Sequence, residues 1–189
     1  SPDLLRALES AREGGAFTVA LVNTPQSPLG KAAECELSQR AGVEKSVTAT
    51  KSVLCTMAGI ARMTAEWSQD ESLLKALRSL PGVLEEAAET GSGMDDKLLA
   101  GRAHAFVLSR GLGYGAATEL GLKLKETCGI HAEAFSTAEV RHGPLEIVNK
   151  EYLVLALAMP GSGEPDVLNA ARELRSQGAS VLVVGRKEI

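Results

Sequence analysis

The residues best suited to chemistry lie in one stretch, 119–144. Its first half reads ELGLKLKET, and residues four and seven positions apart share one face of an α-helix. Glu119, Lys123 and Glu126 therefore form a charged column beside an apolar stripe of leucines that can pack against a core. The alternative is a solvent-exposed ion pair, which stabilises a helix by about 0.2–0.5 kcal/mol.

The same stretch ends in the turn sequence Arg141-His142-Gly143-Pro144. Proline restricts the residue before it, and glycine permits backbone angles that other residues avoid, so this sequence predicts a tight turn. A histidine on such a turn is expected to be exposed and accessible to a ligand rather than buried, although a purely structural histidine is the alternative. Carboxylate, ammonium and imidazole groups together are the side chains of general acid–base catalysis.

An α/β framework is expected to position these residues, because short β-rich runs alternate with amphipathic helical patterns. Apolar runs bounded by glycine and proline predict buried parallel strands. Strands are expected at 16–23, 35–38, 103–110, 151–159 and 179–185. Helices are expected at 1–13, 29–34, 49–69, 72–80, 82–90, 114–128 and 165–177, with a break at Pro81 and a loop at 41–48.

The chain also contains an internal repeat, in which SPDLLRALESAREGGA (1–16) aligns with EPDVLNAARELRSQGA (164–179). Each copy runs into a strand, which indicates two copies of one α/β domain, each an open parallel sheet flanked by helices. We expect the boundary near 80–100, with domains at 1–90 and 91–189. A strand precedes the second copy, so we expect the first copy to be truncated at its N-terminus and the chain to be part of a longer protein.

The composition is that of a globular protein, with 44% hydrophobic and 23% charged residues. A net charge of −4 without a basic run argues against nucleic-acid binding. No apolar run approaches the roughly 18 residues that indicate a membrane span. Cys35, Cys55 and Cys128 lie far apart without a CxxC motif, so we expect a reducing, cytoplasmic location and no disulfide or zinc site.

Three motifs, ELGLKLKET, IHAEAF and EVRHGPLEIV, resemble the second sugar-isomerase (SIS) domain in the isomerase half of glucosamine-6-phosphate synthase. They equally resemble stand-alone relatives of that half, which include phosphosugar isomerases and glucosamine-6-phosphate deaminases. The resemblance extends over nearly the whole chain. It implies tandem SIS domains, the second truncated at its C-terminus, that bind a hexose or hexosamine 6-phosphate without a cofactor or metal.

The resemblance also implies roles for the conspicuous side chains. Glu126 matches the residue that transfers a proton between C1 and C2 of the open-chain sugar, and Lys123 matches a lysine near the reacting oxygens. His142 matches the acid–base group that opens the sugar ring and reaches the sugar from a neighbouring subunit, which implies a homodimer. We interpret Glu119 as the group that orients Lys123.

Phosphate binding is expected in the first domain. Open α/β sheets bind ligands at the carboxyl ends of their strands, and a helix N-terminus favours phosphate. Ser1 stands at such a helix start and resembles the last hydroxyl of the family's phosphate loop, although a plain helix cap is the alternative. Glu164 replaces this hydroxyl in the second copy, so only the first domain is expected to hold phosphate.

The segment GVEKSVTATKS is similar to the family segment that closes over the phosphosugar. Val47 and Ala49 match positions that touch the sugar, largely through the backbone. The synthases often carry serine where Ala49 stands, so Thr48, Thr50 and Lys51 are alternative contacts. Without the resemblance, a threonine before an apolar-periodic run predicts only a helix cap.

Three functions are consistent with these features. The first is an enzyme that isomerises a sugar phosphate or releases ammonia from an amino-sugar phosphate. The second is the isomerase half of a glutamine-dependent synthase, although the sequence includes no glutaminase domain. The third is a non-catalytic phosphosugar sensor, which would not need a base, a cation and an imidazole together.

Overall fold

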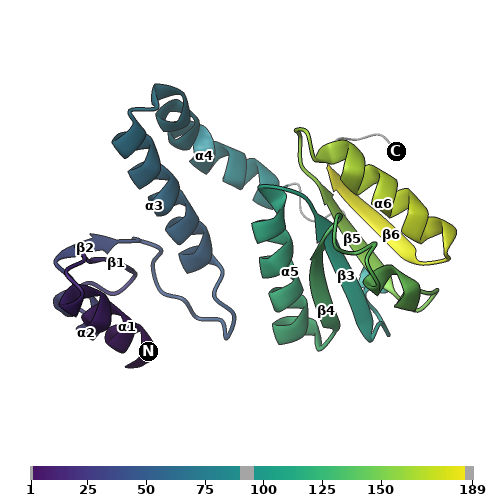
Figure 1. The fold of residues 1–189 in the computed structure, drawn as a ribbon, viewed down its shortest axis with the longest axis horizontal. Coiled ribbons are helices and arrows are strands. Elements are labelled where there is room, and N and C mark those ends of the chain that lie inside the picture. The colour runs from purple at the N-terminus through teal and green to yellow at the C-terminus, as the bar shows by residue number, and fades with distance from the viewer. Residues whose placement is uncertain (1, 90–95, 186–189) are drawn as a thin grey trace. The chain divides into compact units, whose positions relative to one another are not determined.

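The computed structural model describes residues 2–89 and 96–185 (Figure 1). The chain divides into two compact units, Ser1–Ser92 and Gly93–Ile189. None of the described helices is both long and apolar enough to cross a membrane.

The first unit contains a two-stranded parallel sheet and a long pair of helices. Strand β1 pairs with β2 in parallel, with Val19 opposite Cys35. Ala20 and Val22 of β1 are buried, as expected for alternate residues on one face of a strand. The elements are α1 (Pro2–Glu13), β1 (Val19–Val22), α2 (Pro28–Ala32), β2 (Cys35–Ser38), α3 (Lys51–Ser68) and α4 (Glu71–Glu89).

Helix α4 continues through Pro81, so the expected break at this residue was wrong. Proline removes one backbone hydrogen bond from a helix. Leu77, Leu80 and Leu84 lie on both sides of Pro81 and line one apolar groove, together with residues of α3. Because most helical stability in proteins comes from packing, this continuous apolar stripe offsets the lost hydrogen bond.

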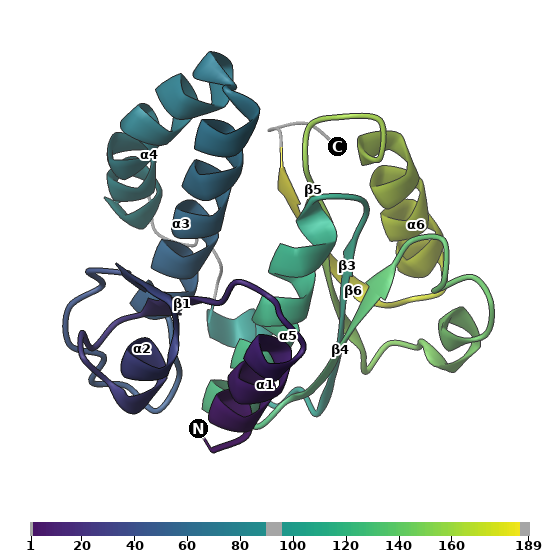
Figure 2. The ribbon, with the colours of Figure 1, turned by 60° about the vertical axis from the view of Figure 1, so that its left-hand side comes forward.

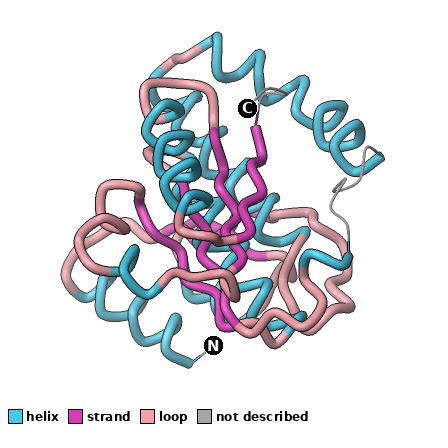
Figure 3. Tube along the Cα trace, turned by 90° about the vertical axis from the view of Figure 1, so that its right-hand side faces the viewer, coloured by secondary structure: helices cyan, strands magenta, loops and turns pink. Residues whose placement is uncertain are grey.

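The second unit is a four-stranded, entirely parallel sheet with the strand order β4-β3-β5-β6. Its two long helices cover opposite faces (Figures 2 and 3). Phe106 and Leu108 of β3 pack in the same cluster as α6, whereas Ala105 and Val107 pack in the same cluster as α5. The elements are η1 (Asp96–Leu98), β3 (His104–Ser109), α5 (Gly113–Cys128), β4 (His131–Ser136), η2 (Pro144–Ile147), β5 (Leu153–Ala158), α6 (Glu164–Ser176) and β6 (Ser180–Gly185).

Strand β4 was missed by the sequence analysis. Its sequence, HAEAFS, contains two alanines and a glutamate, which are poor strand formers. The strand nevertheless pairs with β3 along its whole length, from His104 opposite His131 to Ser109 opposite Ser136. Tertiary pairing with a buried neighbour therefore overrides the weak local preference.

The parallel sheet with flanking helices confirms the expected α/β class for the second unit. In the described part of the first unit the sheet has two strands, so its interpretation as a second copy of the same domain stays a prediction.

Candidate functional site

Helix α5 brings the three predicted charged residues into direct contact. Lys123 Nζ lies 2.9 Å from Glu126 Oε2 and donates a hydrogen bond to it. The same Nζ lies 3.0 Å from Glu119 Oε1. The predicted column is therefore confirmed, and the lysine bridges the two carboxylates.

This cluster is more enclosed than an ordinary surface ion pair. The Lys123 side chain is 19% exposed, and those of Glu119 and Glu126 are about one-third exposed, at 33% and 34%. Leu124, next to the cluster on α5, is buried in the core against the sheet. Partial burial weakens screening by solvent, so the charges interact more strongly than exposed ones.

Both carboxylates raise the pKa of the lysine ammonium. Contact with Glu126, then with Glu119, raises the pKa of Lys123 above its usual value of 10.5, while burial opposes this change. Lys123 is therefore a cation at neutral pH. Glu119 Oε1 is shielded from solvent and its contact with Nζ lacks hydrogen-bond geometry, so this contact is better described as an ion pair.

His142 lies on an exposed turn whose flanks are buried, as expected for a presented side chain. Val140 and Leu145 are buried on either side, and Leu145 N donates to Val140 O at 2.8 Å. Gly143 has φ of 130°, a conformation that side chains other than glycine rarely adopt. The turn is also tied to α6, because Arg141 Nε lies 3.1 Å from Glu173 Oε2.

The topology separates His142 from the charged cluster within one chain. Strands β3 and β4 are parallel, so α5, which connects them, runs in the opposite direction. Glu126 near the end of α5 therefore lies towards the beginning of β4, whereas the His142 turn follows the end of β4. Among the described residues, no hydrogen bond or ion pair joins Glu126 to His142.

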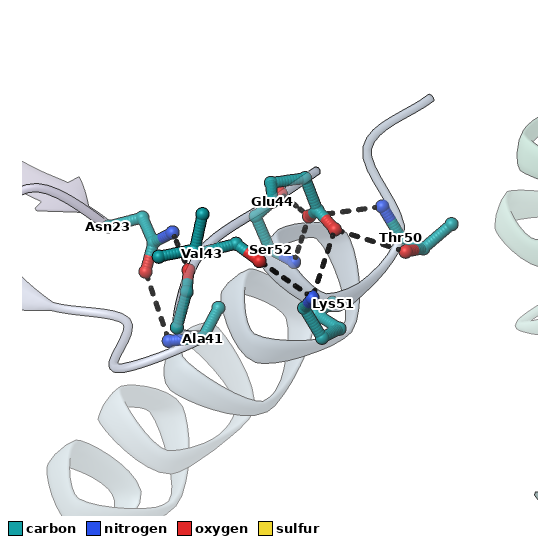
Figure 4. A network of polar contacts seen from close by, with 8 residues as sticks. Asn23, Ala41, Val43, Glu44, Thr50, Lys51 and Ser52 are labelled. Carbon is teal, nitrogen blue, oxygen red and sulfur yellow. Dashed lines mark hydrogen bonds and ion pairs between the residues drawn. The ribbon is translucent and has the colours of Figure 1, made fainter. Parts of the chain in front are cut away.

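In the first unit, the expected ligand loop precedes α3 (Figure 4). Val47 is fully exposed and Ala49 is also exposed, whereas Thr48 is only 5% exposed. Thr50 occupies the helix N-cap, as a threonine at a helix start predicts. Its hydroxyl, however, donates instead to Glu44 Oε1 at 3.2 Å.

Glu44, which the sequence analysis did not single out, is hydrogen-bonded to the start of α3. Its carboxylate accepts from Thr50 N at 3.2 Å, and from Ser52 N and Ser52 Oγ at 3.0 and 2.8 Å. The hydrogen bonds from Ser52, followed by those from Thr50, lower the pKa of Glu44 from 4.5 to about 2, while burial opposes this. An acidic residue six positions before the N-cap was the available signal, but helix-capping rules consider only nearer positions.

Asn23 was also missed, although its position at the end of β1 is a recognisable signal. It contacts the chain just before Glu44, through hydrogen bonds to Ala41 and Gly42. Ser1, the predicted phosphate contact, lies outside the described residues. In the part of the chain that the structure describes, no cluster of three or more His, Cys, Asp or Glu could hold a metal ion.

Comparisons with known proteins agree with this architecture. The family model of the SIS domain matches residues 98–188. An isomerizing glutamine–fructose-6-phosphate aminotransferase of Aquifex aeolicus is 31% identical over 185 residues, which make up 96% of this chain and 31% of the relative. The chain thus spans about a third of the length of the curated relatives that it matches.

Solved structures extend the similarity to other sugar-phosphate proteins. A protein described as a phosphosugar isomerase, from Silicibacter pomeroyi, is 35% identical with a TM-score of 0.89, and the match covers 100% of this chain and 58% of that one. Glucosamine-6-phosphate deaminase of Thermotoga maritima is 25% identical with a TM-score of 0.79, over 96% of this chain and 56% of that one. Residues 98–188 therefore match the SIS domain family, and nearly the whole chain is similar to sugar-phosphate proteins.

Proposed function

We propose that the chain is part of an enzyme that moves a proton between adjacent carbons of a hexose or hexosamine 6-phosphate. The observation that carries this proposal is the position of Lys123 between Glu119 and Glu126 on α5. The relatives named as a phosphosugar isomerase and a glucosamine-6-phosphate deaminase support the class of substrate.

Each side chain of the cluster has a chemical role in this proposal. The Glu126 carboxylate removes the proton from C2 of the open-chain aldose, and the resulting enediol is protonated again at C1 to give the ketose. The Lys123 ammonium stabilises negative charge that develops on the sugar oxygen. Because its pKa is raised, this lysine stays charged over the neutral range. Glu119 holds the ammonium in place.

With an amino sugar the same proton transfer releases ammonia. Removal of the C2 proton gives an enolamine, and protonation at C1 converts the C2 amine into an imine. Water then adds to this imine, and ammonia leaves, which yields fructose 6-phosphate. No co-reactant other than water is required, so the base, the cation and an acid for ring opening are sufficient.

Ring opening is assigned to His142 of a second copy of the chain in a homodimer. The separation of His142 from Glu126 within one chain motivates this assignment, since one active site would need both groups. The exposed turn that carries His142 is well suited to reach a neighbouring molecule.

Substrate binding is proposed for the first unit, through Ser1 and the loop that carries Val47, Thr48, Ala49 and Thr50. The similarity to SIS proteins over nearly the whole chain supports this role. It also supports the interpretation that the first unit, like the second, is a SIS domain. A cytoplasmic location remains part of the same proposal.

A second candidate is the isomerase half of a glutamine-dependent synthase, which the similarity to the aminotransferase of Aquifex aeolicus favours. In that case the same cluster would act on fructose 6-phosphate, and ammonia would be supplied by a glutaminase domain. A sensor that only binds the sugar phosphate is the remaining alternative.

The test is turnover of glucosamine 6-phosphate by the full-length protein, with free ammonia and ketose both measured. Glu126→Gln should lower turnover by about 10²–10⁴-fold, because a general base contributes a factor of this size. Glu133→Gln, on the exposed side of β4, is the matched control and should retain activity.

The outcomes separate the candidates. Ammonia from wild-type protein indicates a deaminase, and a ketose without ammonia indicates an isomerase. Formation of glucosamine 6-phosphate from fructose 6-phosphate and glutamine indicates a synthase. Binding without turnover indicates a sensor, and full activity of the Glu126→Gln protein would show that Glu126 is not the base.

A further inference from the structure

The loop before α3 is held at its first end by one asparagine (Figure 4). Asn23 directly follows β1, and its Nδ2 donates to Gly42 O at 2.7 Å. Its Oδ1 accepts from Ala41 N at 3.0 Å. The side chain therefore binds two consecutive residues as a neighbouring strand would, and fixes where the chain leaves β2.

The other end of the loop is held by Glu44 and Lys51. Glu44 accepts hydrogen bonds from the backbone and hydroxyl groups of both Thr50 and Ser52. Lys51 Nζ donates to Val43 O at 2.8 Å and lies 3.7 Å from Glu44 Oε1. Residues 43–44 are thus bound to the start of α3, which closes the loop upon itself.

These contacts leave only the short loop 45–49 between two fixed points. Fixing both ends of a short loop removes most of its conformational freedom. Burial cannot account for the position of Val47, since this side chain is fully exposed. Thr48 is buried within the loop, so burial contributes there, while the polar contacts made by Asn23 and Glu44 fix the two ends of the loop.

The loop also starts from the edge of the sheet where a ligand is expected. A surface depression of about 690 Å³ lies beyond the carboxyl ends of β1 and β2. Asn23, Gly42, Val43 and Glu44 belong to its lining. Open parallel sheets bind their ligands at this edge, so the residues that hold the loop also border the expected binding surface.

We propose that Asn23 and Glu44 are positioning residues, which hold loop 45–49 in place for contact with the sugar phosphate. This inference rests on the proposed function. In this proposal Glu44 does more than cap the start of α3. A cap needs one acceptor near the first turn, whereas Glu44 accepts hydrogen bonds from Thr50 and Ser52 and lies beside Lys51.

The experiment compares Glu44→Gln with wild type in the full-length protein, using glucosamine 6-phosphate as the probe. The loop contacts the substrate away from the reacting carbons, so it contributes equally to binding of substrate and transition state. Its loss should raise KM about tenfold and leave kcat unchanged. A variant that merely lowers the folded fraction would lower the apparent kcat and leave KM unchanged.

Limited trypsin digestion supplies a readout that does not depend on activity. Lys45 lies inside the held loop, and its peptide bond should be cleaved several-fold faster in Glu44→Gln than in wild type. Glu71→Gln, which changes an exposed glutamate in the first turn of α4, is the matched control and should alter neither KM nor cleavage at Lys45.

Asn23→Asp provides a second variant. Aspartate keeps the acceptor for Ala41 N but places a carboxylate oxygen against Gly42 O, where two acceptors repel, so the rise in KM should be at least as large as for Asn23→Ala.

Faster cleavage at Lys45 with an unchanged KM would overturn the positioning role, and so would unchanged cleavage in Glu44→Gln. A wild-type protein that does not bind glucosamine 6-phosphate would overturn the proposed function and this role with it. In that case digestion would still show whether Glu44 holds the loop, which separates the two failures.

Discussion

Helices α1 and α6 carry the same sequence pattern but differ in what they bury. Both begin with Pro-Asp at equivalent positions and run into a parallel strand, β1 or β6. In α6 the residues of the apolar stripe are buried, whereas among the described residues of α1 none is. The equivalent pairs are Leu4 and Val167, Ala7 and Ala170, Leu8 and Ala171, and Ala11 and Leu174.

The sheets that lie behind the two helices explain this difference. Helix α6 packs against β5 and β6 of a four-stranded sheet. Helix α1 contacts the short helix α2, in a unit whose described sheet has two strands. An amphipathic pattern therefore determines that a helix forms and which face is apolar, but the neighbouring layer determines how much of that face leaves water.

The largest effect expected from this difference is at the buried end of α6. Leu174→Ala should destabilise the protein by about 2–5 kcal/mol, because it removes a fully buried side chain and leaves a cavity. Leu8→Ala in α1 should cost less, since Leu8 is only partly buried. Chemical denaturation of both variants, followed by circular dichroism, measures the two values. Equal losses would show that α1 is as tightly packed as α6.

A glycine in each unit gives a second comparison of packing. A Cβ at Gly113 would lie 2.3 Å from Ser109 Oγ and 2.7 Å from Met159 Cγ, so Gly113→Ala should destabilise by about 1–3 kcal/mol. A Cβ at Gly59 would approach only the tip of Leu21, at 3.1 Å. Gly59→Ala should be neutral or stabilising, because alanine favours a helix interior by up to about 1 kcal/mol.

Thermal unfolding midpoints of the two alanine variants test this second comparison. A lower midpoint for Gly113→Ala together with an unchanged or higher one for Gly59→Ala is the expected result. The reverse order would show that the first unit is the more closely packed around its long helix.

The smallest expected effects are on the pH dependence of stability, which should differ in direction between Glu44 in the first unit and Lys123 in the second. Glu44 in the first unit has its pKa lowered from 4.5 to about 2, so its contribution to stability is present above pH 4.5 and lost as the pH falls towards 2. Lys123 in the second unit has a raised pKa, so its contribution is present below pH 10.5 and lost as the pH rises further.

Variants that remove each group make this prediction measurable. The difference in unfolding midpoint between wild type and Glu44→Gln should shrink in acid, and that between wild type and Lys123→Met should shrink in alkali. Differences that stay constant with pH would show that neither charge contributes through its ionisation.

Much of the framework followed from local sequence patterns. The strand expected at 35–38 was found at Cys35–Ser38, and the helix expected at 49–69 was found at Lys51–Ser68. The break expected at Pro81 and the missed strand β4 have one cause. Pro81 disfavours a helix and the alanines of β4 disfavour a strand, but packing of α4 and pairing of β4 with β3 outweigh these local preferences. Such contacts depend on the fold and cannot be derived from a short window of sequence.

In the candidate site, too, contacts within one element were predictable and contacts between elements were not. The contact of Lys123 with Glu119 and Glu126 was predictable because all three residues share one helix face. Asn23 and Glu44 were missed because their partners come from other elements or from across a loop. Spacing along one element can be derived from sequence, whereas hydrogen bonds between elements require the three-dimensional arrangement.

The place of β3 inside its sheet has a consequence for folding. Ala105 pairs with Ala132 of β4, which follows after one helix, and with Leu153 of β5, which follows much later in the chain. Closing the shorter loop costs less entropy, so we expect β3, α5 and β4 to assemble before β5 docks. During synthesis, one edge of the apolar strand β3 therefore stays open until β5 leaves the ribosome. Such an edge can pair with another chain, so we expect the protein to be prone to aggregation in this interval.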